Sequence, residues 1–287
     1  MIKLILSIFV LSIIACATKS QSTKTEFSKL VPSQSGYVSV NGTDLYYEMY
    51  GSGQPLVLLH GGGSDIHVSF GKGIATLAKN FKVIAFDEQG HGKSPATDRA
   101  FGFENTADDI AAALKQLKIE NALFLGFSNG ATTGMYIAIR HPDVLKKMVL
   151  GSGLYSRSGA PKQFWQAMDK SSLNDMPQEL KDAYLKNSPK PSDLVKMFKF
   201  DSTRMKEFKD VPTKSIQKVQ IPVLIMQTDQ DVASVEHGIQ VTRLLPKGRF
   251  AVLPGPHDNF IGDVSNSSPE MAQASLTIIT EFLKSAQ

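Results

Sequence analysis

The sequence predicts an α/β fold, in which a mostly parallel, doubly wound sheet of about eight strands carries helices on both faces. Short, continuous apolar runs recur along the chain, and helical patterns separate most of them. Runs that do not alternate polar with apolar residues are typical of strands covered on both faces. The length of 287 residues suits one large domain with an insertion. Ligands are then expected at the carboxyl ends of the strands.

The predicted strands begin with a hairpin, because Asn41-Gly42 stands between two apolar runs. The runs that predict strands are 37–40, 45–50, 55–59, 82–87, 122–127, 147–150, 222–226 and 249–253. Between the fourth and fifth runs, Asn105 or Thr106 is expected to cap a helix over 107–117, where apolar residues recur at helical spacing.

Residues 154–218 interrupt this alternation of strands and helices. The segment has several prolines and Lys-rich amphipathic stretches and shows no clear strand. We therefore expect a helical cap over the sheet, inserted between the core segments 37–153 and 219–287. Its aromatic and methionine side chains are expected mainly to form the cap's own small core, while some line the site. These residues are Phe164, Trp165, Met168, Met197, Phe198, Phe200, Met205 and Phe208.

The first residues have the pattern of an export signal. Lys3 precedes an apolar stretch of about 12 residues, which is short for a membrane span of roughly 20. The run I-I-A-C ending at Cys16 resembles the lipobox of bacterial lipoproteins, and A-C-A resembles a site that would release a soluble protein. Residues 1–16 are thus expected to be a signal peptide with lipidation at Cys16. The expected product is an exported cell-envelope lipoprotein, or alternatively a periplasmic or secreted soluble protein.

The composition of the residues after Cys16 differs from that of a folded domain. The polar residues 17–36 are rich in Ser, Thr and Lys and predict a flexible tether.

The formal charge of +4 comes from interleaved basic and acidic residues, which argues against nucleic-acid binding. Cys16 is the only cysteine, so no intrachain disulfide can form. We expect a small-molecule substrate, and contact with a membrane only through a lipidated Cys16.

A serine stands between two glycines after the strand predicted at 122–127. The run G-F-S-N-G at 126–130 matches G-x-S-x-G. That spacing suits a strand-to-helix turn so sharp that side chains beside the serine would collide, and it lifts the hydroxyl to the rim of the sheet. Because the following residues 131–140 can form a helix, Ser128 is predicted to be a nucleophile rather than a structural serine.

A serine hydroxyl needs a general base, and the base needs a carboxylate. His257 is the predicted base, because it follows the last apolar strand in a loop where catalytic groups collect. His60 is expected to shape the turn that it begins. Asp229 and Asp231 both lie just past the strand at 222–226, and either could instead cap that loop.

Four motifs in this order resemble the α/β-hydrolase superfamily, specifically an esterase-like member with a helical cap. They are H-G-G-G at 60–63, D-x-x-G-H-G-x-S at 87–94, G-x-S-x-G at 126–130 and P-G-x-H at 254–257. The resemblance covers about residues 37–285 and includes the order Ser, Asp, His along the chain. It implies Asp231 as the triad acid, with Asp229 as the alternative. Thr228 and Gln89 depart from the family's usual glycine and arginine.

The same chemistry requires donors for the oxyanion of a tetrahedral intermediate. Backbone N–H groups of Asn129 and of Gly61 or Gly62 are the expected donors, each contributing roughly 3 kcal/mol. The predicted function is a serine hydrolase that cleaves a small, apolar ester through an acyl-enzyme, with no metal or cofactor implied. A lactonase, a carbon–carbon bond hydrolase or a cofactor-free perhydrolase would use the same triad. A non-catalytic binding protein on this fold is the alternative of another class.

Overall fold

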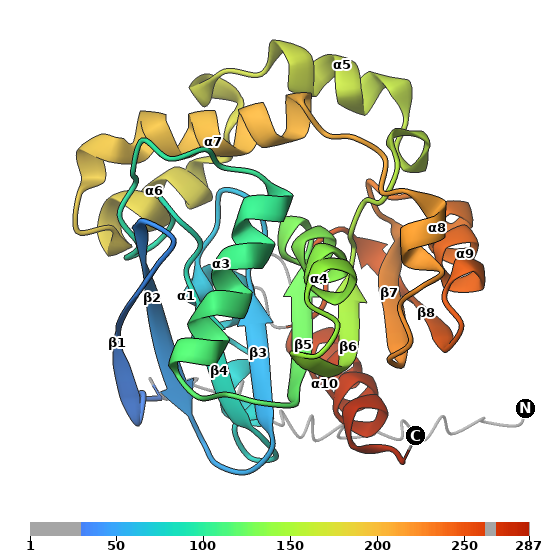
Figure 1. The fold of residues 1–287 in the computed structure, drawn as a ribbon. Helices are drawn as coiled ribbons and strands as arrows, with labels where there is room; N and C mark the ends of the chain where they lie inside the picture. The colour runs from blue at the N-terminus through green and yellow to red at the C-terminus, as the bar shows by residue number, and fades with distance from the viewer. Residues whose placement is uncertain (1–29, 262–267, 287) are drawn as a thin grey trace, which may run out of the picture.

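The computed structural model describes residues 30–261 and 268–286 (Figure 1). The predicted signal peptide, Cys16 and most of the predicted tether lie outside the described residues, so they stay predictions. Within the described ranges, none of the helices combines the length and the apolar character needed to cross a membrane.

One sheet of eight strands organises the molecule, in the order β1-β2-β4-β3-β5-β6-β7-β8. β1 runs antiparallel to β2, and β2 antiparallel to β4, while the remaining neighbours are parallel. The predicted fold class, a mostly parallel sheet of about eight strands, is confirmed. The strands are β1 (Gln34–Val40), β2 (Thr43–Tyr50), β3 (Pro55–Leu59), β4 (Lys82–Phe86), β5 (Ala122–Phe127), β6 (Leu145–Gly151), β7 (Val223–Gln230) and β8 (Gly248–Pro256).

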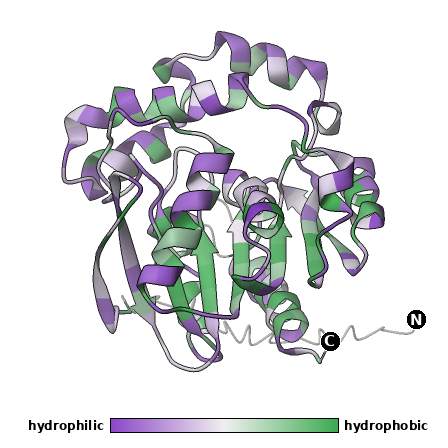
Figure 2. Cartoon of the chain, viewed as in Figure 1, coloured by the Kyte–Doolittle hydropathy of each residue, from purple (hydrophilic) through white to green (hydrophobic). Residues whose placement is uncertain are grey.

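The central strands send alternate side chains into two cores, one on each face of the sheet. In β3, Val57 and Leu59 join one core while Leu56 and Leu58 join the other, and all four are fully buried. Figure 2 shows these strands as the most apolar part of the molecule. The first face is covered by α3 (Phe103–Gln116), α4 (Asn129–Arg140), α8 (Thr213–Ile216) and α9 (Val235–Leu244); the second by α1 (Ile66–Phe70), α2 (Ile74–Leu77) and α10 (Pro269–Lys284).

Helices of the predicted cap segment cross the top of the sheet in Figure 1. Met176, Tyr184 and Met197 form a small core within this layer. Trp165 and Phe208 instead join the core on the first face of the sheet. The helices of this layer are α5 (Lys162–Lys170), α6 (Gln178–Asn187) and α7 (Leu194–Lys206), with short 3-10 turns at Arg157–Gly159, Leu173–Asp175 and Pro191–Asp193.

Two predicted boundaries are wrong by a few residues. β1 begins at Gln34, inside the segment predicted as tether up to residue 36. α3 begins at Phe103 with Gly102 as its N-cap, rather than at 107 with a cap from Asn105 or Thr106. The buried ring of Phe103, stacked on Tyr136, extends the helix by a turn, because tertiary packing overrides the local preference of capping residues.

Candidate active site

β5 passes into α4 through a strained turn at Ser128, whose φ is 52° and ψ −117°. This conformation is uncommon for a residue with a side chain. A Cβ at Gly126 would lie 2.4 Å from the carbonyl oxygen of Gly130, and one at Gly130 would lie 2.2 Å from that of Leu59. Both glycines are therefore required, as the spacing of the motif predicts, and the turn exposes the serine at the carboxyl edge of the sheet.

Three side chains from three strand ends meet at this edge. The His257 Nε2 lies 3.1 Å from the Ser128 Oγ, and the His257 Nδ1 lies 2.6 Å from the Asp231 Oδ1. Asp231 directly follows β7 and His257 directly follows β8. The imidazole also packs on the ring of Phe127, 5.0 Å between centroids. The arrangement can therefore relay a proton from the serine to a histidine whose tautomer is fixed by a carboxylate.

An extra residue in β8 brings His257 beside Asp231. Thr228 pairs with Leu253, but Gln230 pairs with Pro256, so three residues of β8 span two of β7. The bulge includes Gly255, whose φ of 121° suits glycine.

The two candidate acids have different surroundings. The side chain of Asp231 is fully buried and accepts hydrogen bonds from His257, the Ser152 hydroxyl and the Ala233 N–H. Burial alone would raise the pKa of Asp231, but its hydrogen bond with His257, the charge of His257 and the hydrogen bond from Ser152 outweigh burial and lower it. Asp229 is exposed and accepts the Gly255 N–H at 2.8 Å. The structure thus brings Asp231 to His257 and leaves Asp229 as a loop cap.

Ser152 is a contact of the acid that sequence reasoning missed. It directly follows β6, its hydroxyl donates to the Asp231 Oδ2, and its N–H donates to the Met226 carbonyl at 2.8 Å. The only available signal is a polar residue at the carboxyl end of a central strand, which by itself belongs to no motif.

Ser152→Ala should lower kcat/KM by about tenfold, because a hydrogen bond to a charged group contributes about 1.5–3 kcal/mol and the acid keeps its other donors. Steady-state kinetics on one ester would measure the loss. Ser158→Ala is a matched control, since within the described residues that exposed hydroxyl hydrogen-bonds only with the Ser156 hydroxyl. Equal rates for Ser152→Ala and Ser158→Ala would contradict a role for Ser152 in orienting the acid.

The loop after β3 has one unused amide at the border of the site. The Gly61 N–H donates to the Ser69 Oγ at 3.2 Å, and the Gly63 N–H donates to Asp201. In the described part of the chain, the Gly62 N–H has no hydrogen-bond acceptor, and Gly62 borders the cavity that contains Ser128. Of the two alternatives at this position, the geometry favours Gly62 over Gly61.

The second predicted donor, Asn129, lies beside Gly62 and also borders the cavity. Asn129 is the first residue of α4, so its N–H has no intrahelical acceptor. Its side chain packs against the loop, because a Cβ at Gly62 would come within 2.4 Å of the Asn129 Nδ2. Both predicted oxyanion donors therefore border the same cavity as the serine hydroxyl.

His60 holds the same loop in place, as its position before the glycines predicts. The ring is fully buried; its Nδ1 donates to the Gly61 carbonyl at 2.7 Å, and its Nε2 accepts the Glu88 N–H at 3.0 Å. Accepting a hydrogen bond at Nε2 requires a neutral ring. Burial lowers the pKa of His60, in agreement with that state.

A cavity of about 400 Å³ opens above Ser128, under the cap. Its lining is largely apolar, and five of the eight cap side chains singled out in the sequence border it, more than expected. In the described ranges no Lys or Arg lines it, whereas Asp175 and Asp201 do. The apolar lining consists of Leu154, Phe164, Met168, Met176, Pro177, Leu180, Met197, Phe198, Met205 and Val232.

A second cavity of about 330 Å³ shares Ser128 and His257 with the first. It is bordered by Glu179 and Asp258, and its lining is more polar than that of the first cavity. A substrate bound at Ser128 can therefore place its two halves in different surroundings. Over the described ranges, no cluster of three or more His, Cys, Asp or Glu side chains is arranged to hold a metal ion.

Comparison with known proteins supports the assignment of the fold. The sequence matches the family model of the alpha/beta hydrolase fold over residues 54–194. A meta-cleavage product hydrolase from Pseudomonas fluorescens IP01 superposes with a TM-score of 0.72 at 18% identity, covering 86% of this chain and 97% of that one. This chain has the α/β-hydrolase fold.

Two relatives show how far this hydrolase-fold chain resembles characterised sequences. The serine hydrolase BPHL of Homo sapiens is 38% identical over 128 residues, which are 42% of this chain and 44% of that protein. The alignment thus spans less than half of that relative. The bifunctional esterase/perhydrolase DCH of Acinetobacter calcoaceticus is 26% identical over 77% of this chain and 92% of that protein.

Proposed function

We propose that this chain is a serine hydrolase that cleaves a small, apolar, uncharged ester through an acyl-enzyme. The observation that carries the proposal is the His257 imidazole, held between the Ser128 hydroxyl at 3.1 Å and the Asp231 carboxylate at 2.6 Å. The relatives support hydrolysis as the reaction class, since they are named as hydrolases or as an esterase/perhydrolase.

The proposed reaction follows from the contacts of these side chains. The Ser128 Oγ attacks the ester carbonyl while the His257 Nε2 takes the hydroxyl proton, and Asp231 stabilises the resulting imidazolium. The N–H groups of Gly62 and Asn129 stabilise the negative oxygen of the tetrahedral intermediate. The intermediate collapses as the histidine returns the proton to the leaving alcohol. Water then attacks the acyl-enzyme by the same steps.

The cavity lining supports an uncharged substrate. Apolar side chains from the cap surround the space above the serine, and the charged groups that border it are carboxylates. An anionic acyl chain would lose its hydration there and gain no cationic partner from the lining, which costs several kcal/mol. We therefore place the apolar acyl group in the larger cavity and the leaving alcohol in the second.

Hydrolysis of paired esters would test this assignment. We expect kcat/KM for p-nitrophenyl hexanoate to exceed that for the p-nitrophenyl monoester of adipic acid by more than about 100-fold, because the two acyl chains differ in the buried carboxylate. Comparable rates for the pair would contradict the substrate class. Faster hydrolysis of matched lactones would favour the lactonase alternative. If the folded protein does not react with a fluorophosphonate probe, the non-catalytic alternative is correct.

A further inference from the structure

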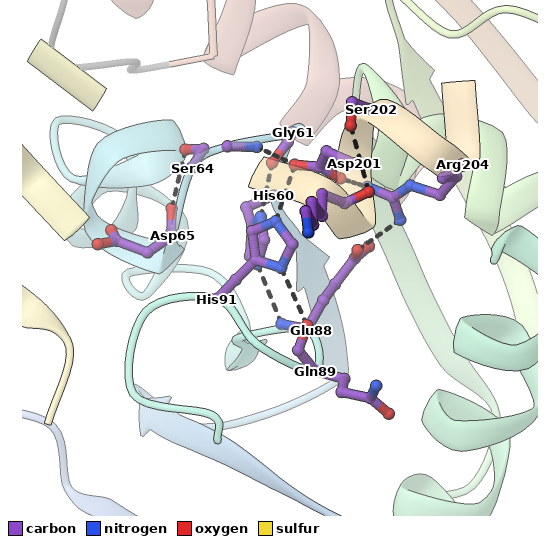
Figure 3. Close-up of polar contacts among 12 residues, drawn as sticks. His60, Gly61, Ser64, Asp65, Glu88, Gln89, His91, Asp201, Ser202 and Arg204 are labelled. Atoms are coloured by element: carbon purple, nitrogen blue, oxygen red, sulfur yellow. Dashed lines mark hydrogen bonds and ion pairs between the residues drawn. The ribbon is translucent and has the colours of Figure 1, made fainter. Parts of the chain in front are cut away.

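Four charged side chains, three of them buried and one partly exposed, join the cap helix α7 to the loop after β4 (Figure 3). We call Asp201, Arg204, Glu88 and His91 the Asp201 cluster. The Arg204 guanidinium lies 2.6 Å from the Glu88 carboxylate and 2.5 Å from the Asp201 carboxylate. The His91 Nε2 lies 2.8 Å from the Asp201 Oδ2. The side chains are 1%, 0%, 0% and 13% exposed for Arg204, Glu88, His91 and Asp201 respectively.

The ring of His91 is charged in this arrangement. Its Nδ1 faces the Gln89 carbonyl at 3.1 Å and its Nε2 faces the Asp201 carboxylate, so both ring nitrogens must donate. Burial alone would lower the pKa of His91, but the charge and hydrogen bond of Asp201 raise it above its ordinary value. Burial would likewise raise the pKa of Asp201, but the charges of His91 and Arg204 hold it below its usual range. Asp201 is therefore ionised between two cations.

The cluster is poorly arranged as a device for stability alone. Its hydrogen bonding is incomplete, since the Glu88 Oε1 and the Arg204 Nε are buried without a partner in the described part of the chain. Replacing buried ion pairs with apolar residues is often neutral or stabilising. A better account of the cluster is that it holds another part of the molecule, the glycine loop, in position.

Asp201 also reaches the loop that carries the unused amide. Its Oδ2 accepts the Gly63 N–H and would lie 3.3 Å from a Cβ at Gly62. On the other side of Gly62, the Gly61 N–H is held by Ser69. The amide of Gly62 is thus flanked by two anchored amides, and one of the two anchors belongs to the cap rather than to the sheet domain.

We propose that Asp201 is a positioning residue for the oxyanion hole: its carboxylate, carried by α7, holds the Gly63 amide and thereby aims the Gly62 amide at the reacting oxygen. The inference rests on the proposed function of Ser128. It couples the position of the cap to catalysis, because the loop is fully anchored only when α7 lies over the sheet. Loss of one oxyanion donor lowers kcat by about 10²–10³-fold, and a misaimed donor by less.

Kinetics of two Asp201 variants would test the inference. We expect Asp201→Ala to lower kcat by about 10- to 100-fold with KM within about threefold of wild type. Asp201→Asn keeps an oxygen that can accept the Gly63 N–H. Its kcat should therefore lie between the values of wild type and Asp201→Ala. Asn187→Ala is the matched control, because it removes a 2.7 Å hydrogen bond from α6 to Asp65, the N-cap of α1, and leaves the amides of Gly61 and Gly63 with their acceptors. That variant should retain wild-type kcat within about threefold.

Affinity for an alkyl trifluoromethyl ketone gives a readout that a merely structural role would not change. The Ser128 Oγ bonds to the ketone carbon, the carbonyl electron pair moves to oxygen, and the hydroxyl proton passes to His257. The resulting oxyanion needs the same donors as the reaction. The affinity should therefore fall by the same factor as kcat in both Asp201 variants. Circular dichroism and thermal unfolding report folding; if Asp201→Ala does not fold, Asp201→Asn decides.

The outcomes separate this inference from the proposed function. If wild type reacts with a fluorophosphonate and hydrolyses esters while both Asp201 variants keep wild-type kcat, the inference is wrong and the proposed function stands. A rise in KM alone would make Asp201 a substrate contact and overturn the inference. An equal loss in Asn187→Ala would assign the effect to cap attachment and overturn it as well. Failure of wild type to react with the probe would refute the proposed function itself.

Discussion

Ser128→Ala should lower kcat for ester hydrolysis by about 10⁴- to 10⁶-fold, because the hydroxyl that the His257 imidazole faces at 3.1 Å would be absent. The strained backbone at this position tolerates alanine no worse than serine, since both have a Cβ. The fold should persist, and circular dichroism would show it. Activity measured at high enzyme concentration would give the residual rate.

Covalent labelling provides the control for this variant. A fluorophosphonate should modify wild type and Ser158→Ala, and mass spectrometry should find the adduct on Ser128. Ser128→Ala should remain unlabelled. Residual activity above about one per cent of wild type, or an adduct on another residue, would contradict the assignment of Ser128 as the nucleophile.

Asp231→Asn should have the second-largest effect, a loss of about 10⁴-fold in kcat. The carboxylate accepts a hydrogen bond from the His257 Nδ1 at 2.6 Å, which leaves Nε2 unprotonated toward the serine. An asparagine can instead donate its amide to Nδ1, which stabilises the wrong tautomer for a general base. Rates at saturating ester, compared with wild type, would measure this loss.

Asp229→Asn is the matched control, because the same change is made two residues away. Its carboxylate caps the Gly255 N–H at 2.8 Å and does not contact the imidazole. We expect kcat within about threefold of wild type, since an asparagine oxygen can accept the same hydrogen bond. A larger loss at Asp229 than at Asp231 would reverse the assignment of the acid.

The parts of the site that local sequence determines could be predicted. A strand, a sharp turn and a helix are specified within a few residues around Ser128. The two glycines of the motif are needed because a Cβ at either position would lie only 2.4 or 2.2 Å from a backbone carbonyl oxygen. His257 was predictable for a related reason, because a strand that ends in a loop places its next side chain at the edge where ligands bind. The two layers of core followed from strands without alternation.

Contacts between distant segments could not be predicted from the sequence. Asp229 and Asp231 stand equally close to a strand end, and only the return of β8 shows which one meets the histidine. Asp201 reaches His91 across 110 positions, and Ser152 reaches Asp231 across 79, with no motif to signal either contact. Such pairings depend on how the cap and the strands are placed in space, which neither composition nor periodicity records.

The additional residue in β8 determines whether acid and base are neighbours at all. Beyond the bulge Gln230 stands beside Pro256, so the next step along both strands sets Asp231 beside His257. In an unbroken ladder continued from Thr228 and Leu253, the histidine would fall opposite residue 232 and, because strands alternate, project from the other face. The proton relay thus depends on the register of two parallel strands. The single inserted residue shifts that register by one position, half of the two-residue repeat, and so turns the histidine to the face that carries the acid.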